Sequence, residues 1–522
     1  MPPLNRTRAW IAIIALGILG VGTLLWTTRG GIGISPDSVV YIDAAESLLS
    51  GQGYVEHKAS GERLPLIHFP PGYPLLLTLL GKLGFRILAG ARWLNAILFG
   101  FNIALVGILA MRSTRGAVVP GILGSVLMLT SSNMLSNHAW AMSEPAFLFL
   151  GMLGLGLLAA YVERPTPLCL AGAVAAVGLA FTIRYLGVSF VAVGFIGLLA
   201  LPGQRNLRRR VADALLFAGL SSLPMAVFVV RNRLVRGGVA DFQLGFHGLT
   251  GKQLWEGVNT ISSWLVPEAV PAFPRVAFLA LVTSLAVAAA LAVMRRRHGE
   301  STDNRMGRSA LAIPMLLAIF VVVYYLGLLG FIAFASSGIS FDSRYLLPVQ
   351  EAVFILVLWL GYEWLSLPVT RRLNRVAATL ACVAVAAGYA ARSTRYAVRA
   401  RDGLGYANAK LASAAIFRTV RALPPQVKVF SNKPSAVHYF TGRDVFTIPI
   451  KSDPHSGSAN PRFEREMSSL GQMLEEDRAA VVYLRSFGGA FVASEDELTR
   501  QLPVRLLEAS AEGTVYRGST AK

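Results

Sequence analysis

The chain is poor in charged residues and nearly free of cysteine. Charged side chains make up 15% of its 522 residues, two residues are cysteine, and 54% are hydrophobic. Soluble domains usually carry about 25% charged residues, so the composition argues against an ordinary soluble enzyme of this length. It favours a protein that crosses a membrane several times.

Short catalytic motifs are also missing. The two cysteines, Cys169 and Cys382, lie within apolar segments and form neither a disulfide framework nor a metal-binding motif. The sequence has no glycine-rich phosphate loop, no Ser–His–Asp order, no internal repeat and no low-complexity tract. Neither a nucleotide-binding loop nor a hydrolase triad is therefore expected.

Acidic residues are fewer than basic ones, 29 against 49, which gives a net charge of +20. Such an excess is typical of proteins that bind nucleic acid. Here, however, the arginines gather in short runs between hydrophobic segments, where they orient a membrane protein and contact anionic lipid. We therefore expect membrane lipid as a partner and no nucleic acid. The runs hold Arg112 and Arg115, Arg205 to Arg210, Arg295 to Arg297, and Arg371, Arg372 and Arg375.

About eleven segments approach the ~20 apolar residues that a membrane span needs. Arg6 and Arg8 precede the first, which predicts a cytoplasmic start and, by alternation, places every arginine run on the inner side. No small-residue cleavage site follows the first segment, so a retained anchor is expected rather than a signal peptide. The spans are expected near 10–27, 92–111, 116–132, 143–161, 167–183, 186–202, 211–230, 273–294, 309–335, 346–366 and 375–391.

This count places four basic residues on the outer side, against the general rule. Either these residues bind anions or one span is miscounted. They are Arg231, Arg233, Arg236 and Lys252.

The predicted first outer loop, 28–91, contains two helical segments. Residues Asp37 to Ser50 predict a helix with Asp37 as N-cap or first-turn residue and Gly51 as its stop. Asp37 and Tyr41 are four residues apart and share a face of that helix. Its two other acidic residues, Asp43 and Glu46, are expected to point away.

A second short segment begins at His68 and continues through Pro70-Pro71 into Leu75 to Leu77. It is too short for a span, so an interfacial or re-entrant helix is expected. Prolines at its start suit a helix N-terminus.

The composition changes after residue 391. We expect residues 1–391 to form a transmembrane domain and residues 392–522 a small α/β domain outside the cytoplasm, large enough for a core of its own. Ser494 and Glu497 fit a capping box. The predicted strands are 427–430, 445–448, 480–484 and 514–516, with helices near 405–422, 462–477 and 494–501.

Two residues of the outer loop could carry chemistry, and each has an ordinary alternative. Asp37 is either a helix cap or a general base that takes a proton from an acceptor hydroxyl. His68 is either an interfacial histidine or a metal ligand or proton partner for Asp37. No cofactor is certain, and a divalent metal ion at His68 is left open.

Three further ionisable residues lie at predicted outer membrane edges. Glu144 opens a span, where it either caps the helix or faces a polar cavity. Arg184 and Arg344 either extend toward the interface or bind a phosphate through paired charged hydrogen bonds. Asp342 is close enough in sequence to pair with Arg344.

Together these residues resemble the membrane glycosyltransferases of the GT-C fold, and in particular the family that contains aminoarabinose transferases and protein O-mannosyltransferases. The resemblance covers most of the chain in layout, but its motifs are short. Two positions depart from the family pattern: Ser38 replaces a second acidic residue, and His68-Phe69 stand where some members have Glu-Lys. The matching elements are Pro36-Asp37 with Tyr41, Leu48-Leu49-Ser50-Gly51, Pro70-Pro71-Gly72-Tyr73, Glu144, Arg184 and Arg344-Tyr345-Leu346-Leu347-Pro348.

The resemblance implies a multi-pass enzyme of the cell membrane that moves a sugar from a polyprenyl-phosphate carrier to a glycan, lipid or protein acceptor outside the cytoplasm. Asp37 would be the base of an inverting single displacement, and Arg184 and Arg344 would stabilise the lipid phosphate that leaves. Tyr41, Glu144 and His68 are the other residues expected at the substrate site.

Two other functions compete with this interpretation. A transporter or flippase of lipid-linked sugars would place charged groups at mid-bilayer and use interrupted helices. A non-catalytic subunit for envelope assembly would keep the fold without turnover.

Overall fold

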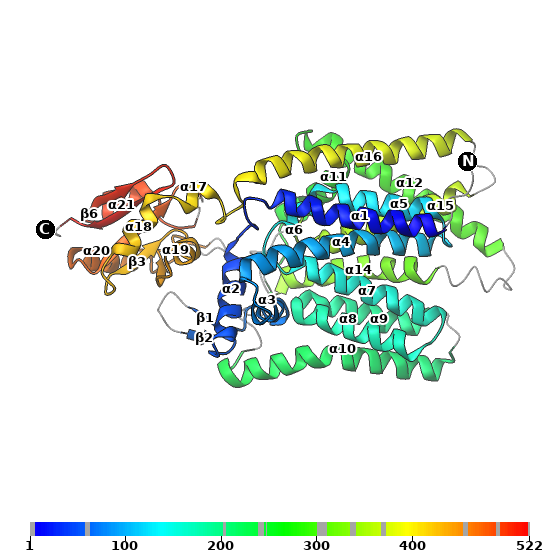
Figure 1. Cartoon of the computed structure of the whole chain (residues 1–522), viewed down its shortest axis with the longest axis horizontal. Coiled ribbons are helices and arrows are strands. Elements are labelled where there is room, and N and C mark those ends of the chain that lie inside the picture. Colours follow the sequence, from blue (N-terminus) through cyan, green and yellow to red (C-terminus); the bar gives the residue numbers. More distant parts are fainter. Residues whose placement is uncertain are drawn as a thin grey trace. The chain divides into compact units, whose positions relative to one another are not determined.

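The computed structural model describes residues 6–57, 63–201, 205–238, 245–246, 248–299, 311–334, 341–366, 372–452, 458–486 and 491–519. The chain divides into two compact units (Figure 1). The first comprises Met1–Thr27, Ile67–Leu76 and Gly90–Arg399, and the second Thr28–Leu66, Leu77–Ala89 and Ala400–Lys522. This division differs from the predicted one, because most of the 28–91 loop groups with the C-terminal residues.

The first unit is a bundle of helices, and each apolar segment expected to span the membrane lies on one of them. Among the described residues, six helices are long and apolar enough to cross a membrane, and α5 with α6, which meet at a bend of 58°, would make a seventh span if they cross as one. A count of eleven spans therefore stays a prediction. The helices are α1 (Arg6–Thr27), α4 (Ile87–Ser113), α5 (Val118–Thr130), α6 (Ser132–His138), α7 (Glu144–Glu163), α8 (Pro167–Ile183), η1 (Tyr185–Gly187), α9 (Val188–Ala200), α10 (Leu207–Arg236), α11 (Gly251–Leu265), α12 (Ala272–Gly299), α14 (Ala312–Phe334), α15 (Leu347–Leu365) and α16 (Arg372–Arg399).

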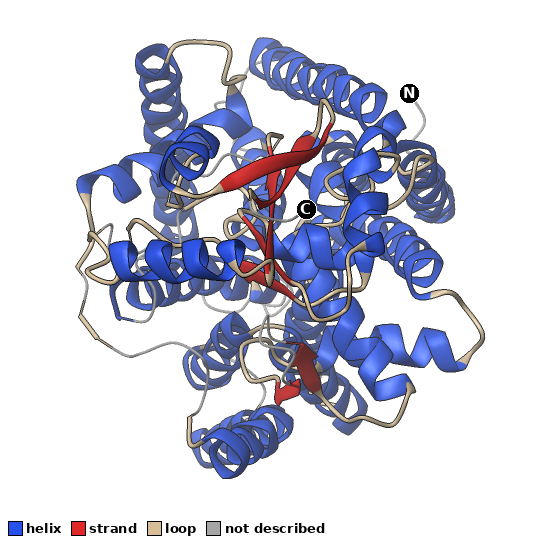
Figure 2. Cartoon of the chain, turned by 90° about the vertical axis from the view of Figure 1, so that its left-hand side faces the viewer, coloured by secondary structure: helices blue, strands red, loops and turns tan. Residues whose placement is uncertain are grey.

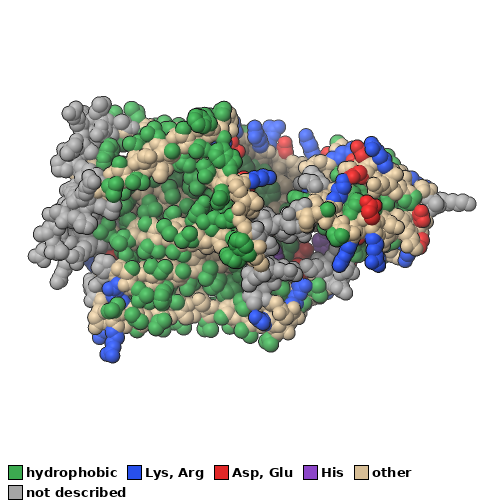
Figure 3. All heavy atoms as spheres, turned by 180° about the vertical axis from the view of Figure 1, so that it is seen from behind, with side chains coloured by type: hydrophobic (Ala, Val, Ile, Leu, Met, Phe, Trp, Pro, Cys, Tyr) green, Lys and Arg blue, Asp and Glu red, His purple; other side chains and the backbone are tan. Residues whose placement is uncertain are grey.

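The outer faces of the bundle helices are apolar. Leucine and isoleucine side chains such as Ile18 (67% exposed) and Leu223 (56%) face outward, and hydrophobic side chains cover this face of the bundle in Figure 3. Some polar groups are paired inside the bundle, as where the Ser125 hydroxyl donates to the Ile103 carbonyl across α5 and α4 at 3.0 Å. This inside-out arrangement is the one that a lipid environment demands.

The second unit contains a five-stranded sheet in the order β4-β3-β5-β7-β6, seen among its helices in Figure 2. Strand β3 pairs parallel with β4 and β5, whereas β7 pairs antiparallel with β5 and β6. The elements are α2 (Pro36–Leu49), β1 (Val55–His57), β2 (Arg63–Pro65), η2 (Ala400–Asp402), α17 (Ala409–Ala412), α18 (Ala415–Ala422), β3 (Lys428–Ser431), α19 (Pro434–Thr441), β4 (Val445–Thr447), α20 (Phe463–Glu475), β5 (Ala479–Leu484), α21 (Glu495–Gln501), β6 (Val504–Ala509) and β7 (Gly513–Gly518); α3 (Gly72–Lys82) has residues in both units.

Alternation along β5 builds a core on each face of this sheet. Ala480 and Val482 pack with α18 and α19 on one face, and Ala479 and Val481 pack with α20 and α21 on the other. This period of two is the expected one for a strand covered on both sides by helices.

The predicted secondary structure of residues 392–522 is mostly found. All four predicted strands are present, and Ser494 with Glu497 forms the predicted capping box. Strand β6 was not predicted, because its leucines at 506 and 507 lie on an exposed edge and give no alternation. The predicted helix at 405–422 is broken into α17 and α18, and α19 was missed.

Candidate active site

The first unit brings three of the predicted site residues together. Glu144 is the first residue of α7 and is 3% exposed. Its Oε1 atom lies 2.5 Å from Nη1 of Arg184 and also accepts a hydrogen bond from Nε of Arg344. Arg184 caps the C-terminus of α8, and Arg344 lies in the turn before α15. Three segments far apart in sequence thus converge on one carboxylate oxygen.

Neighbouring groups orient the two guanidinium groups. The Ser143 hydroxyl accepts from Nη1 of Arg184 at 3.1 Å. Both guanidinium carbons lie over the Tyr345 ring, at 5.7 Å for Arg184 and 5.6 Å for Arg344. Two guanidinium groups thus share one oxygen of Glu144, and the Asp342 carboxylate also acts on Arg344 electrostatically.

The sequence offered Asp342 as a pairing partner for Arg344, and the structure gives Asp342 another role. The Asp342 carboxylate accepts from the backbone N–H groups of Arg344 at 2.9 Å and Tyr345 at 3.1 Å, and so caps the turn. The guanidinium of Arg344 is bonded to Glu144 instead. Burial raises the pKa of Asp342, although the backbone bonds and Arg344 oppose this shift. The cluster is therefore built around Glu144.

A buried amide network supports the start of α7. Asn102 of α4 donates to the Pro145 carbonyl at 3.2 Å and bonds Nε2 of His138 at 3.0 Å, while Nδ1 of His138 bonds the Met134 carbonyl at 2.7 Å. Two turns earlier on α4, Asn95 donates to the carbonyls of His138 and Trp140. Sequence reasoning missed this network, although two asparagines seven residues apart in an apolar helix were a usable signal.

His68 lies on a segment that packs beside Arg184. The Tyr185 hydroxyl donates to the Ile67 carbonyl at 2.9 Å, and a Cβ on Gly72 would come within 2.8 Å of the Thr182 backbone. The His68 side chain is exposed and meets Phe69 edge to face, with ring centroids 4.5 Å apart. The described part of the chain holds no group of three His, Cys, Asp or Glu side chains that could bind a metal ion. A metal at His68 thus has no structural support.

Asp37 and Tyr41 lie in the second unit, on α2. The N-cap of α2 is Ser35, whose hydroxyl accepts from the Ser38 N–H at 3.2 Å while the Ser38 hydroxyl accepts from the Ser35 N–H at 3.0 Å. Asp37 is therefore a half-buried first-turn residue and not the cap. Its carboxylate sits at the positive end of the helix dipole. Ser38, the departure from the family pattern, is one half of the capping box.

Asp43 connects α2 to α19 of the second unit, and Tyr41 of the same helix is buried. Tyr41 is 3% exposed. Asp43 Oδ2 lies 3.3 Å from Nε2 of His438 on α19, and Nδ1 of His438 bonds the Arg443 carbonyl at 2.8 Å. The Asp43 bond raises the pKa of His438 to about 9, against the effect of burial. Burial and, next, Asp43 raise the pKa of Glu46.

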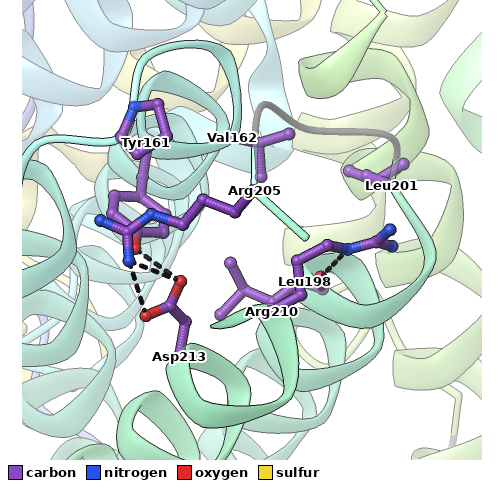
Figure 4. A pocket seen from close by; sticks show the side chains of 8 residues that line it. Tyr161, Val162, Leu198, Leu201, Arg205, Arg210 and Asp213 are labelled. Atoms are coloured by element: carbon purple, nitrogen blue, oxygen red, sulfur yellow. Dashed lines mark hydrogen bonds and ion pairs between the residues drawn. The ribbon is translucent and has the colours of Figure 1, made fainter. Parts of the chain in front are cut away.

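A third polar cluster lines a small pocket at the far end of α7 (Figure 4). Asp213 accepts from Nη1 of Arg205 at 3.1 and 3.2 Å and from the Tyr161 hydroxyl at 2.8 Å. Arg210 is bonded to backbone carbonyls of α9, including that of Leu198 at 3.1 Å. Because these side chains satisfy one another, the cluster fits a structural role.

No protein-family model matches the chain, and no curated protein matches its sequence. Solved structures do match. ArnT from Cupriavidus metallidurans bound to undecaprenyl phosphate is 12% identical, with a TM-score of 0.53 over 97% of each chain; its apo state gives 0.59 over 99% of this chain and 100% of that one.

Two larger proteins share the same architecture. The oligosaccharyltransferase AglB from Archaeoglobus fulgidus, in complex with an inhibitory peptide and a dolichol-phosphate, is 11% identical, with a TM-score of 0.50 over 90% of this chain and 69% of that one. The arabinofuranosyltransferase AftD from Mycobacteria is 13% identical, with a TM-score of 0.53 over 99% of this chain and 40% of that one. The predicted GT-C fold is thereby confirmed.

Proposed function

We propose that this chain is a membrane glycosyltransferase that moves a sugar from a polyprenyl-phosphate carrier to an acceptor outside the cytoplasm. The observation that carries the proposal is the convergence of Arg184 and Arg344 on buried Glu144, within a GT-C fold. ArnT is described as bound to undecaprenyl phosphate and AglB as bound to a dolichol-phosphate, which supports a lipid phosphate as the ligand here.

The arginine pair suits a lipid phosphate for physical reasons. A guanidinium stays protonated beside lipid and presents donors in a planar fork that matches phosphate oxygens. Glu144 fixes both side chains through its Oε1 atom, so the two guanidinium groups are held close together. As the bond between sugar and phosphate breaks, charge develops on the phosphate, and a low dielectric makes its stabilisation strong.

Asp37 is the proposed general base. It would take the proton of the acceptor nucleophile, whose lone pair forms the new bond to the anomeric carbon while the bond to the polyprenyl phosphate breaks. One displacement of this kind inverts the anomeric carbon. Glu144 does not fit this role, because one of its oxygens is bonded by two guanidinium groups. Tyr41 and His68 are proposed to line the substrate site.

The test is the envelope glycan of cells that lack the protein. Mass spectrometry should show which glycan disappears, and expression of the wild-type chain should restore it. D37N should not restore the glycan, whereas D43N, the same change on the same helix, should restore most of it. Equal restoration by both variants would reject Asp37 as the base.

A further inference from the structure

Arg275 of the first unit is a buried arginine with no carboxylate partner in the described part of the chain. It lies in the first turn of α12 and is 5% exposed. Its Nη2 donates to Oδ1 of Asn259 on α11 at 2.5 Å, but its Nε and Nη1 are buried and have no hydrogen-bond partner among the residues that the structure describes. A guanidinium in this state is strongly unfavourable unless an anion completes it.

Arg392 of α16 is in a similar state and contacts the same helix, α11. Its Nη1 donates to the Ser263 carbonyl of α11 at 2.8 Å, and its guanidinium lies 4.9 Å from the Tyr389 ring centroid. Its Nε is buried and has no partner among the described residues. Exposed Glu268 acts on this charge from a distance but forms no ion pair with it in the described part of the chain.

Both arginines contact helix α11. Asn259 and Ser263 are four residues apart, so the two arginines contact α11 about one helical turn, or ~6 Å, apart. Trp264, the neighbour of Ser263, is 6% exposed, and its indole N–H also has no partner among the described residues. The N-terminus of α12 adds positive potential beside Arg275.

This cluster lies at the same end of the first unit as Glu144 but uses other residues. Ser393, next to Arg392, donates to the Thr130 carbonyl at the end of α5, just before α6 and the start of α7. Gly257 of α11 contacts Phe341, three residues before Arg344. Helices α11, α12 and α16 can be followed at that end of the bundle in Figure 1.

We infer that Arg275, Arg392 and Trp264 form a second oxyanion site, which binds a phosphate group. Two guanidinium groups and an indole offer several N–H donors, which suit a tetrahedral anion with several acceptor oxygens. A neutral sugar would gain no charge-assisted hydrogen bonds of this kind. Binding of a phosphate at this site does not depend on the proposed function. Only the assignment of that phosphate to the sugar acceptor rests on it. A membrane phospholipid offers the same chemistry.

Binding to the full-length protein in neutral detergent tests this site with two probes, phosphatidylglycerol and glucose 1-phosphate. R275Q should bind the preferred probe about tenfold to a hundredfold more weakly than the wild type, since charged hydrogen bonds are lost, and R392Q should weaken it in the same direction. R399Q, which changes an exposed arginine of α16 two turns beyond Arg392, should bind as the wild type does. Preference for phosphatidylglycerol would identify a membrane lipid, and preference for glucose 1-phosphate an acceptor.

The inference is overturned if neither probe binds the wild type, or if R275Q and R392Q bind as tightly as R399Q. R275K keeps the charge and should recover part of the affinity; if R275Q does not fold, half-buried Arg392 carries the test. R275Q should still bind undecaprenyl phosphate. Substitution of Arg184 and Arg344 should abolish the binding of undecaprenyl phosphate. This difference would separate the second site from the one in the proposed function.

Discussion

Two carboxylates of this protein lie at helix starts and have opposite surroundings. Glu144 opens α7, is buried, and is bonded by the guanidinium groups of Arg184 and Arg344. Asp37 lies in the first turn of α2 and is half-buried, and the capping duty at that helix start falls to Ser35 and Ser38. The Glu144 carboxylate holds two guanidinium groups in place. The Asp37 carboxylate does not cap its helix, because Ser35 and Ser38 do. We therefore expect Glu144 to contribute to stability and Asp37 to turnover.

The largest expected effect is on turnover at Asp37. D37N should lower the rate of sugar transfer in membrane vesicles by about 10²- to 10⁴-fold, the usual contribution of a general base, with the midpoint of thermal unfolding unchanged. D37E keeps a carboxylate and should retain more activity than D37N. A D37N protein with wild-type turnover would contradict the expectation that Asp37 contributes to turnover.

Loss of either arginine should come next in size. R184Q or R344Q should lower transfer by about 10²- to 10³-fold, as for other groups that stabilise developing charge. The R344K variant keeps a charge but not the planar fork, and should fall between R344Q and the wild type. R205Q serves as the control, because Arg205 lies beside the other end of α7. It should keep the turnover of the wild type in the same assay.

Substitution of Glu144 should act mainly on stability. E144Q leaves two guanidinium groups facing each other without a counter-charge, which should cost about 3–5 kcal/mol of the free energy of unfolding. Thermal unfolding in detergent should show a lower midpoint for E144Q than for E163Q, at the opposite end of the same helix. An E144Q protein as stable as E163Q would show that Glu144 is not the organising charge.

The smallest expected effect is at the Asp43–His438 pair. The pKa of His438 is raised to about 9 from 6.5, so its stabilisation is complete below pH 6.5 and is lost as pH rises through 9. H438Q should remove roughly 1–2 kcal/mol of stability at pH 7 and flatten this pH dependence. Unfolding midpoints from pH 6 to 10 measure it, and an identical pH profile in H438Q would refute the role of the pair.

Local features were predictable because they depend on neighbours in sequence. Hydropathy located the helices that carry the expected spans but not α6 or α11, Glu144 was expected to open a helix, and the Ser494–Glu497 capping box is present. Asp37 was correctly placed in the first turn, but the cap itself, Ser35, was not identified.

The contacts of Arg344 could not be predicted in the same way. Its neighbour Asp342 was the obvious partner in sequence, and Glu144, 200 residues away, is the partner in the structure. Likewise, Asp43 meets His438 and Asn102 meets His138 only because distant segments pack together. Such pairings depend on tertiary packing, which one sequence does not reveal.

Binding of undecaprenyl phosphate to the purified protein tests the central claim most directly, because it requires neither the sugar nor the acceptor. The wild type and D37N should bind it equally well, while undecaprenol, which lacks the phosphate, should bind far more weakly. The R184Q–R344Q double variant should bind undecaprenyl phosphate about a hundredfold more weakly than the wild type. Equal binding by the double variant and the wild type would contradict the account.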